Sequence, residues 1–470
     1  MRFFDRKAEL EEIELLDKKK PSFLVITGRR RVGKTELILH FLSKRTNIAY
    51  FFVDDKKNEL LLVKEYLEAL RHFSLPAFAK DITTIDSFLA LLFELAKDND
   101  MVIAFDEFQR FMKISPSAIN QFQKLWDTNK GKMLLLISGS SIGMIKKIFI
   151  EEKAPLFKRA DNIITLQPFR FKQVYEILDN LHIKDFEEKL KLYFLFGGTI
   201  YYYRLIEKYD AKNFEDAVSK LILRDLAPLK TEVRDIFVEE FGKEHGTYYE
   251  ILHAISTGKS TKKEMADFVH VGETSLSPYI MDMKDLLGII SYSIPVTEPA
   301  KSKKGRYFTA ESFFNFWFRF IYRNMSSYEG GDYKIIEEKV NEQKSAFFGF
   351  EFEKLCMEII AEENKNGRLP AHFTKIGKWW GHIKEAGQKK EVEIDIAAVN
   401  EREILFAECK WKDNIDAEAI LLELKEKAKA VGWNKGAEYY AIFAKSFRRR
   451  AKDAICFDIK DLHRIVNRQG

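Results

Sequence analysis

Cysteine, proline and long apolar runs are scarce in this chain of 470 residues. Its three cysteines form no C-x-x-C pair, which argues against a disulfide framework and fits a reducing compartment. Ten prolines argue against long disordered linkers. A membrane-spanning helix needs about 18 or more apolar residues in a row, and the sequence has no such run. The first residues also lack the apolar segment of a secretory signal. We therefore expect a cytoplasmic protein with no membrane span.

The net charge of +5 is concentrated at the C-terminal end, where residues 441–470 contain eight Lys and Arg against three Asp. A segment of this kind binds nucleic-acid phosphates in some proteins and is only a solvated helix face in others, and its charge leaves both interpretations open. Hydrophobic residues make up 46% of the chain, enough for substantial cores, and the length predicts about two to four domains.

A glycine-rich loop at residues 28–35 has the spacing G-x-x-x-x-G-K-[ST] of a phosphate-binding P-loop. An apolar run at residues 23–27 predicts a strand before it, and residues 36–42 predict a helix after it, which is the context that this motif needs. Backbone N–H groups of such a loop surround phosphate oxygens, and the helix N-terminus adds partial positive charge. The residues expected to bind nucleotide here are Gly28, Arg29, Arg30, Arg31, Val32, Gly33, Lys34, Thr35 and Glu36.

Within this loop, Lys34 is expected to reach the β- and γ-phosphates of ATP, and the Thr35 hydroxyl to ligate Mg²⁺. A second apolar run, residues 101–105, ends in Asp106 and Glu107. At the end of a buried strand, Asp106 would complete the magnesium shell. Glu107 would polarise the attacking water as a general base.

A further predicted strand, residues 133–137, ends in a serine-rich turn. Ser138 or Ser140 is expected to sense the γ-phosphate, although serines at strand ends are also ordinary turn residues. With residues 47–53 and 162–166, five apolar segments alternate with helical patterns, which predicts an α/β fold with a parallel sheet covered by helices on both faces. Ligands of such a sheet bind at the carboxyl ends of its strands.

The middle of the chain is predicted to be mainly helical. Residues 169–240 show amphipathic helical patterns, as expected for a helical lid over a nucleotide. Residues 241–325 predict three short helices and a hairpin, the order of a winged helix-turn-helix, with a capping box at residues 261–264. The third helix is poor in basic residues. We therefore expect any phosphate contact to come from the basic hairpin loop, which contains Lys301, Lys303, Lys304 and Arg306.

Acidic and apolar residues alternate at 391–396, which predicts a half-buried strand, and residues 404–410 predict its partner. A hairpin of these strands would bring together Asp395, Glu408 and Lys410, and a preceding helix would add Glu353. Carboxylates are the ligands that Mg²⁺ or Mn²⁺ prefers, and Lys410 would orient the attacking water. We predict metal ligation by Glu353, Asp395 and Glu408.

Together with residues 4–6 and 155–159, these motifs resemble the archaeal-type ATPase family, which is related to the AAA+ and STAND P-loop NTPases. The resemblance implies ATP hydrolysis and makes Arg159 a candidate to contact the γ-phosphate, in cis or in trans; a purely structural arginine is the alternative. Lys158 departs from the family's usual glycine. The Asp395–Glu408–Lys410 set resembles the core of restriction-endonuclease-like nucleases, which such ATPases often carry at the C-terminus.

The expected domains are a P-loop ATPase core (1–168), a helical lid (169–240), a winged helix-turn-helix (241–325) and an α/β restriction-endonuclease-like domain (340–470). The first hypothesis is an ATP-Mg²⁺ switch that acts on a DNA-binding nuclease domain. The alternative is a nucleotide-dependent scaffold or signalling protein whose C-terminal domain binds DNA without cutting it. The expected partners are ATP, DNA and, with a trans-acting arginine, further copies of the chain.

Overall fold

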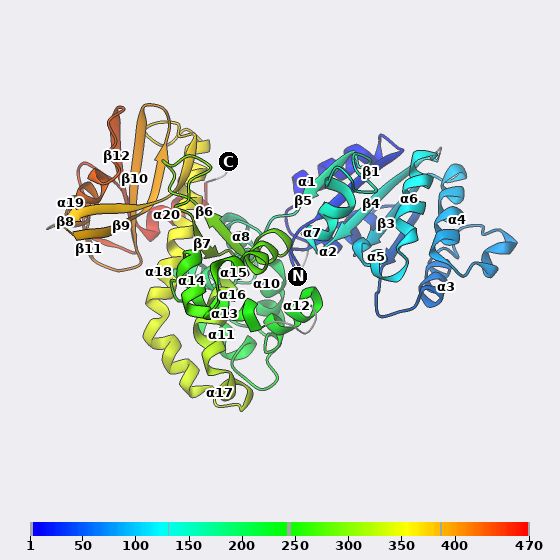
Figure 1. Ribbon diagram of the computed structural model, residues 1–470, viewed down its shortest axis with the longest axis horizontal. Helices are drawn as coiled ribbons and strands as arrows, with labels where there is room; N and C mark the ends of the chain where they lie inside the picture. Colours follow the sequence, from blue (N-terminus) through cyan, green and yellow to red (C-terminus); the bar gives the residue numbers. More distant parts are fainter. Residues whose placement is uncertain (1–2, 130, 242–245, 386–387, 469–470) are drawn as a thin grey trace. The chain divides into compact units, whose positions relative to one another are not determined.

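The computed structural model describes residues 3–129, 131–241, 246–385 and 388–468. The chain divides into two compact units (Figure 1). The first consists of Met1–Pro168 with the short segments Thr199–Tyr201 and Asp285–Gly288. The second consists of Phe169–Gly198, Tyr202–Lys284 and Ile289–Gly470. None of the helices in the described part of the chain is long and apolar enough to cross a membrane.

The first unit is built on a parallel sheet with the strand order β2-β3-β4-β1-β5. Its strands are β1 (Ser22–Thr27), β2 (Ile48–Phe52), β3 (Met101–Asp106), β4 (Met133–Gly139) and β5 (Asn162–Thr165). Every residue of β1, β3 and β4 is buried. Continuous apolar runs of this kind are typical of strands that are covered on both faces. The predicted parallel α/β sheet is therefore confirmed.

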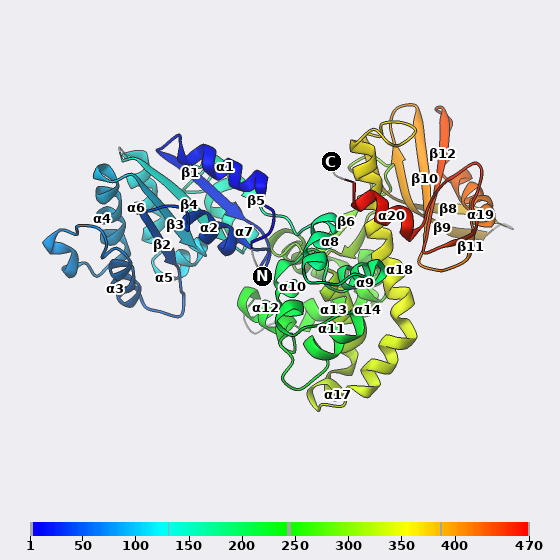
Figure 2. The ribbon, with the colours of Figure 1, turned by 180° about the vertical axis from the view of Figure 1, so that it is seen from behind.

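Helices cover both faces of this sheet (Figure 1 and Figure 2). Side chains of β1 alternate between two cores: Phe23 and Val25 pack with α3, α4 and α6, whereas Leu24 and Ile26 pack with α1 and α2. The helices are α1 (Lys7–Asp17), α2 (Lys34–Leu42), α3 (Glu59–Ala69), α4 (Ile85–Asp98), α5 (Phe111–Ile114), α6 (Ser117–Asp127) and α7 (Ile142–Ile145). Successive side chains of a strand point to opposite faces, so the apolar run of β1 contributes to both cores.

The register of the sheet aligns the ends of its strands. Thr27 of β1 lies opposite Gly139 of β4, and Phe52 of β2 lies opposite Asp106 of β3. The residues that follow β1, β3 and β4 therefore share the carboxyl edge of the sheet, where ligands bind in this class of fold.

The second unit begins with helices and continues into a hairpin. Its helices up to the hairpin are α8 (Phe171–Asn180), α9 (Phe186–Phe196), α10 (Ile200–Lys208), α11 (Phe214–Leu221), α12 (Glu232–Phe241), α13 (Gly246–Ser256), α14 (Lys262–Val269) and α15 (Glu273–Met281). β6 (Ile290–Ser293) and β7 (Arg306–Thr309) then pair antiparallel. At the start of α14, Thr261 and Glu264 form the predicted capping box. The order of α13, α14, α15 and the hairpin is the one that the sequence predicted.

A mixed sheet with the order β14-β12-β10-β9-β8 forms the C-terminal part of the second unit. β8, β9 and β10 are antiparallel neighbours, and β12 and β14 continue the sheet in parallel. Its strands are β8 (Lys375–Glu385), β9 (Gln388–Val399), β10 (Glu403–Lys410), β12 (Ala437–Ala444) and β14 (Ile455–Phe457). A separate short ladder pairs β11 (Ile415–Asp416) with β13 (Phe447–Arg449).

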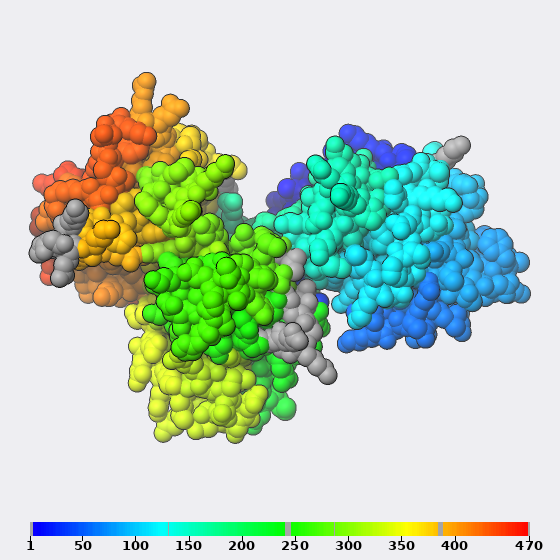
Figure 3. All heavy atoms as spheres, viewed as in Figure 1, coloured from blue at the N-terminus to red at the C-terminus, as the bar shows by residue number. Residues whose placement is uncertain are grey.

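Several helices complete this unit, and α19 (Ala417–Lys429) is one that packs against the mixed sheet. The others are α16 (Ser312–Phe316), α17 (Met325–Glu329), α18 (Lys334–Lys365) and α20 (Ile459–Val466). Leu424 and Ala428 of α19 share a core with Ile394 and Phe406 of the sheet. In the space-filling view, the green atoms of the helices around the hairpin border the yellow and orange atoms of α18 and the sheet (Figure 3).

Candidate functional site

The P-loop has the backbone conformation that its glycines permit. Gly28 and Gly33 have φ values of +148° and +101°, and Arg31 also has a positive φ of 65°. A Cβ at Gly28 would lie 2.6 Å from the carbonyl oxygen of Leu166, so a side chain does not fit there. Left-handed residues of this kind turn successive backbone N–H groups towards one side of a loop.

Lys34 begins α2, and its ammonium group is held inside the loop. Its side chain is buried, and Nζ donates hydrogen bonds to the carbonyl oxygens of Gly28 (2.8 Å) and Arg29 (2.9 Å). Glu36 lies in the first turn of the same helix. The structure thus places a positive charge and a helix N-terminus at one point, which is the arrangement that attracts phosphate.

Asp106, at the end of β3, accepts hydrogen bonds from three hydroxyl groups. Thr35 Oγ1 lies 2.6 Å from Oδ2, Tyr50 OH lies 3.0 Å from the same oxygen, and Ser138 Oγ donates to Oδ1. Burial, with the nearby charge of Asp106, raises the pKa of Tyr50 well above its usual value, so this hydroxyl remains a donor. Thr35 and Asp106 therefore lie together, as a shared Mg²⁺ requires.

Glu107 follows directly and is held in a left-handed conformation with φ 59°. Its Oε2 accepts hydrogen bonds from Ser140 Oγ (2.8 Å) and Gln109 Nε2 (2.6 Å). Burial favours the neutral acid, but the charge of Lys34 and these hydrogen bonds outweigh it and lower the pKa of Glu107. The carboxylate is therefore charged at neutral pH, as a base that accepts a proton from water must be.

Arg6, in the N-terminal segment, forms hydrogen bonds that hold the P-loop. Its guanidinium donates to the carbonyl oxygen of Val32 (3.1 Å) and to that of Gln167 (2.8 Å), and it pairs with Glu9. Only 7% of the Arg6 side chain is exposed. The sequence element at residues 4–6 thus connects the loop after β1 to the segment after β5.

Arg159 lies at the opposite edge of the sheet from the P-loop. β5 begins at Asn162, shortly after Arg159. Just before β5, the Asp161 N–H donates to the carbonyl of Phe23, at the start of β1. Nε and Nη2 of Arg159 bind both carboxylate oxygens of Asp127, at 2.7 and 2.8 Å. The six residues of β1 separate Arg159 from the edge that carries the P-loop, and its contact with a γ-phosphate, in cis or in trans, stays a prediction.

The second candidate site lies where β9 and β10 meet. Asp395 and Glu408 stand next to the pair Ile396–Ala407 of the antiparallel register, and the Cys409 N–H donates to Asp395 Oδ2 at 2.8 Å. Two lysines donate to Glu408 Oε1: Lys410 at 2.6 Å and Lys427, from α19, at 2.8 Å. The other oxygen, Oε2, is buried and has no hydrogen-bond partner among the described residues.

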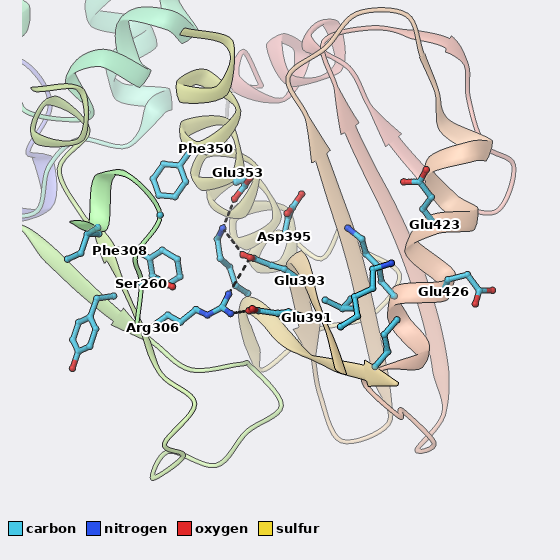
Figure 4. Close-up of a pocket in the computed structure, with 18 residues that line it drawn as sticks. Ser260, Arg306, Phe308, Phe350, Glu353, Glu391, Glu393, Asp395, Glu423 and Glu426 are labelled. Atoms are coloured by element: carbon cyan, nitrogen blue, oxygen red, sulfur yellow. Dashed lines mark hydrogen bonds and ion pairs between the residues drawn. The ribbon is translucent and has the colours of Figure 1, made fainter. Parts of the chain in front are cut away.

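Glu353 of α18 reaches the same place and pairs with Lys378 of β8, which also lies 3.6 Å from Glu393 (Figure 4). Burial, followed by the charges of Glu353 and Glu408, raises the pKa of Asp395 to about 7. Burial also raises the pKa of Glu353, although Lys378 opposes the shift. The expected residues thus converge, and their negative charge is only partly compensated.

Among the described residues, no group of three or more His, Cys, Asp and Glu side chains is arranged to hold a metal ion. The expected set of three carboxylate ligands is therefore not assembled, since Glu353 is engaged by Lys378. Asp395 and Glu408 nevertheless fit one divalent cation, because each offers a hard oxygen and Glu408 Oε2 has no described partner. Water and phosphate would supply the other ligands.

Two residues of these sites escaped the sequence analysis. Tyr50 lies in the middle of an apolar strand, and Lys427 lies in a helix 19 residues beyond its partner Glu408. Neither position belongs to a motif. Only the alternation of β2, which places Tyr50 on one face, offered a signal.

Comparisons with known proteins agree with the description of the nucleotide site. A family model described as "ATPase domain predominantly from Archaea" matches residues 3–228, and one described as "Archaea bacterial proteins of unknown function" matches residues 317–428. An uncharacterized protein of Methanocaldococcus jannaschii is 33% identical over 482 residues, which cover 98% of this chain and 99% of that protein. A second one from the same organism is 35% identical over 91 residues, 19% of this chain and 84% of its own length.

Among solved structures, the Walker-type ATPase of Pyrococcus abyssi is similar over 67% of this chain and 96% of its own, with a TM-score of 0.54 and 17% identity. This likeness concerns the fold. The full-length relative and the match to the ATPase model confirm the family resemblance that the motifs indicated. The chain belongs to the family of P-loop ATPases that occurs predominantly in Archaea, and residues 3–228 match its ATPase domain.

Proposed function

We propose that this ATPase is a switch: ATP-Mg²⁺ binding and hydrolysis in the first unit control a nucleic-acid-binding, metal-dependent nuclease centre in the second. The observation that carries the proposal is the convergence of Asp395, Glu408 and Lys410 beside one buried carboxylate oxygen with no described partner. An acidic pair with an adjacent lysine is suited to phosphodiester hydrolysis, because it combines cation ligands with a donor to the attacking water.

At the nucleotide, each residue would act through a contact already described. Lys34 would leave the carbonyls of the loop for the β- and γ-phosphates, and Thr35 and Asp106 would hold Mg²⁺. Glu107 would accept the proton of the attacking water. Ser140 donates to Glu107 and is thereby suited to report the state of the γ-phosphate to the base.

Arg159 would act on the nucleotide of another copy of the chain, as arginine fingers supplied in trans do. That role would require Arg159 to leave Asp127. The first unit would then work as part of a homo-oligomer. The four sequence-based domains (1–168, 169–240, 241–325 and 340–470) would be the moving parts of such a switch.

At the nuclease centre, a bound divalent cation would polarise the phosphate and lower the pKa of an attached water. Asp395 and Glu408 would hold the cation. Lys410 would position the attacking water, and Lys427 would keep the Glu408 carboxylate oriented from α19. A nucleic acid is the substrate class that this centre suits, through its phosphodiester backbone, and DNA is the one that we test.

One paired assay tests the proposal. We would incubate supercoiled plasmid with the full chain, Mn²⁺ or Mg²⁺, and ATP, ADP or no nucleotide. We expect nicking that depends on the nucleotide and is lost in Asp395→Ala and Lys410→Ala, while a matched exposed-site variant, Asp453→Ala, keeps it. Nicking that is unaffected in Asp395→Ala would contradict the nuclease centre.

The alternative is a nucleotide-dependent scaffold or signalling protein with an inert DNA-binding C-terminal region. The ion pair of Lys378 with Glu353 favours it, because it neutralises one expected metal ligand. Plasmid that stays intact in every condition but is retained in a nucleotide-dependent gel shift would support the scaffold and overturn the nuclease.

A further inference from the structure

The nuclease-like centre opens into a cavity within the second unit. The cavity has a volume of about 850 Å³ and is lined by residues of β7, α18, β8, β9 and α19, with Asp395 in its wall (Figure 4). The hairpin β6–β7, whose basic loop was expected to make any phosphate contact, forms one side of this cavity. Its residues Arg306, Tyr307 and Phe308 line it.

Three hydrogen bonds fasten the hairpin and its loop to β8. The Val296 N–H donates to the carbonyl of Lys378 at 3.0 Å. Trp379 Nε1 donates to Thr297 Oγ1 at 3.1 Å, and Trp380 Nε1 donates to the carbonyl of Lys304 at 2.8 Å. The two tryptophans that precede the acidic strand thus hold the hairpin as a fixed wall of the cavity.

Arg306 completes this wall. Its guanidinium pairs with Glu391 and Glu393 of β9, the latter at 3.4 Å, and stacks over Trp380 at 4.9 Å. The Arg306 side chain therefore contacts β9 rather than extending towards solvent. Lys304 is likewise paired, with Glu298 at 2.6 Å. This leaves fewer free cations on the hairpin for a duplex than its sequence suggested.

Two of the half-buried aromatic side chains that line the same cavity lie next to Lys378. Phe308 of β7 and Phe350 of α18 lie on the side of Glu353 in Figure 4. The ammonium of Lys378 lies 5.5 Å from the Phe308 ring and 5.7 Å from the Phe350 ring. Aromatic faces next to a cation form the kind of surface on which unpaired bases stack.

We propose that this cavity takes a single nucleic-acid strand, such as an unpaired end or flap, and presents its backbone to Asp395 in the cavity wall. The inference rests on the proposed function and deepens it by naming the substrate class. A volume of about 850 Å³ lies in the range of roughly 300–1,000 Å³ typical of ligand pockets, enough for a few nucleotides. A duplex keeps its bases stacked inside, so Phe308 and Phe350 cannot reach them.

The charged side chains that line the cavity determine whether a nucleic-acid strand can bind there without a cation. Its lining includes four basic side chains against six carboxylates, so a polyanion meets a net negative surface. The basic residues are Arg306, Lys378, Lys390 and Lys427, and the acidic ones are Glu353, Glu391, Glu393, Asp395, Glu423 and Glu426. A divalent cation at Asp395 would offset this excess of negative charge and attract a phosphate. Binding of a strand in the cavity is therefore expected to require the cation.

The experiment measures fluorescence anisotropy with three labelled DNA probes of one sequence: a single strand, a blunt duplex and a duplex with a single-stranded overhang. The full chain is used with Ca²⁺, which supports binding with little cleavage, or with EDTA. We expect the single strand and the overhang to bind in Ca²⁺ at least tenfold more tightly than the blunt duplex. Equal or tighter binding of the blunt duplex would overturn the inference.

Variants tie this preference to the cavity. Phe308→Ala and Phe350→Ala should each weaken single-strand binding about five- to 100-fold, as expected for loss of one stacked base. Blunt-duplex binding should change little. Phe78→Ala, at an exposed aromatic residue of the ATPase unit, is the matched control and should leave both unchanged. Thermal unfolding of each variant checks that it is folded.

The outcomes separate the two proposals. If no probe binds in either cation condition, the proposed nucleic-acid function fails as a whole. If probes bind, but Phe308→Ala and Phe350→Ala lower duplex and single-strand affinity alike, only the strand preference fails.

Discussion

The two candidate sites of this protein differ in how completely their polar groups are satisfied within the chain. At the P-loop, Asp106 accepts from three hydroxyl groups and Lys34 donates to two carbonyl oxygens. At the nuclease-like centre, Glu408 Oε2 is buried with no partner among the described residues, and burial raises the pKa of Asp395 to about 7. The first site is stable as it stands, whereas the second contains charge that a ligand would relieve.

This difference reflects where the residues of each site come from. The nucleotide site is assembled at one edge of a parallel sheet, so neighbouring strands supply donors to each acid. The other site joins α18, β9, β10 and α19, and ion pairs between different elements, Lys378 with Glu353 and Lys427 with Glu408, balance part of its charge. A buried carboxylate without enough donors is costly in free energy, and such imbalance is typical of functional sites.

The largest expected effect concerns the base of the nucleotide site. Glu107→Gln should lower ATP turnover by about 10²–10⁴-fold, the usual contribution of a general base. The amide keeps an oxygen that accepts from Ser140, so ATP should still bind. Steady-state phosphate release and nucleotide binding by fluorescence measure the two effects. Glu94→Gln, at an exposed glutamate, should change neither. Unchanged turnover in Glu107→Gln would remove this residue from the mechanism.

Removing the ammonium group of Lys34 from the P-loop should have a comparable or slightly smaller effect on ATP turnover. Lys34→Ala is expected to reduce ATP hydrolysis about 10²–10³-fold, because one donor to the transferred phosphate is lost. Lys44→Ala, at an exposed lysine just beyond the same helix, is the control. Phosphate release again provides the measurement. A Lys34→Ala protein as active as the parent would contradict the assignment of this site.

The opposite pKa shifts of the two sites predict opposite responses to pH. Asp395 holds its proton up to about pH 7 in the folded chain but only to about 4 when unfolded. The free energy of unfolding of the second unit should therefore fall as the pH rises from about 4 to 7. Asp395→Asn should remove this loss and stabilise the unit by up to about 4 kcal/mol at pH 8. Urea unfolding followed by hydrogen exchange in each unit measures it.

Asp453→Asn, at an exposed aspartate of the same unit, is the matched control and should leave the pH profile unchanged. In the first unit, the lowered pKa of Glu107 contributes stability above its unfolded pKa, which is lost as the pH falls through the folded value. If both units lost stability in the same pH direction, the contrast between the two sites would be wrong.

The smallest expected effect tests the redundancy of donors at Asp106. Tyr50→Phe removes one of its three hydroxyl donors, with a cost of about 1 kcal/mol in the stability of the first unit. Thr35 and Ser138 continue to donate to the carboxylate. ATP turnover should therefore stay close to that of the parent. Tyr66→Phe, whose hydroxyl donates to a backbone carbonyl at 3.0 Å, provides the comparison.

Much of the ATPase unit could be predicted from the sequence because its signals are local. The apolar runs of β1, β3 and β4 predicted buried parallel strands, and Asp106 and Ser138 follow from strand ends that must share one edge. The position of Arg159 could not be predicted, because a short motif does not reveal at which edge of the sheet its loop lies. Its partner Asp127 belongs to another helix.

For the nuclease-like centre, the sequence determined the two acidic strands and therefore the proximity of Asp395, Glu408 and Lys410. A period of two fixes which residues of a strand share a face. Only the tertiary structure decided that Lys378 forms an ion pair with Glu353 and that Lys427 reaches Glu408 from α19. It also decided that the hairpin closes one side of the cavity. These contacts join elements far apart in the chain, and no local periodicity records the packing that brings them together.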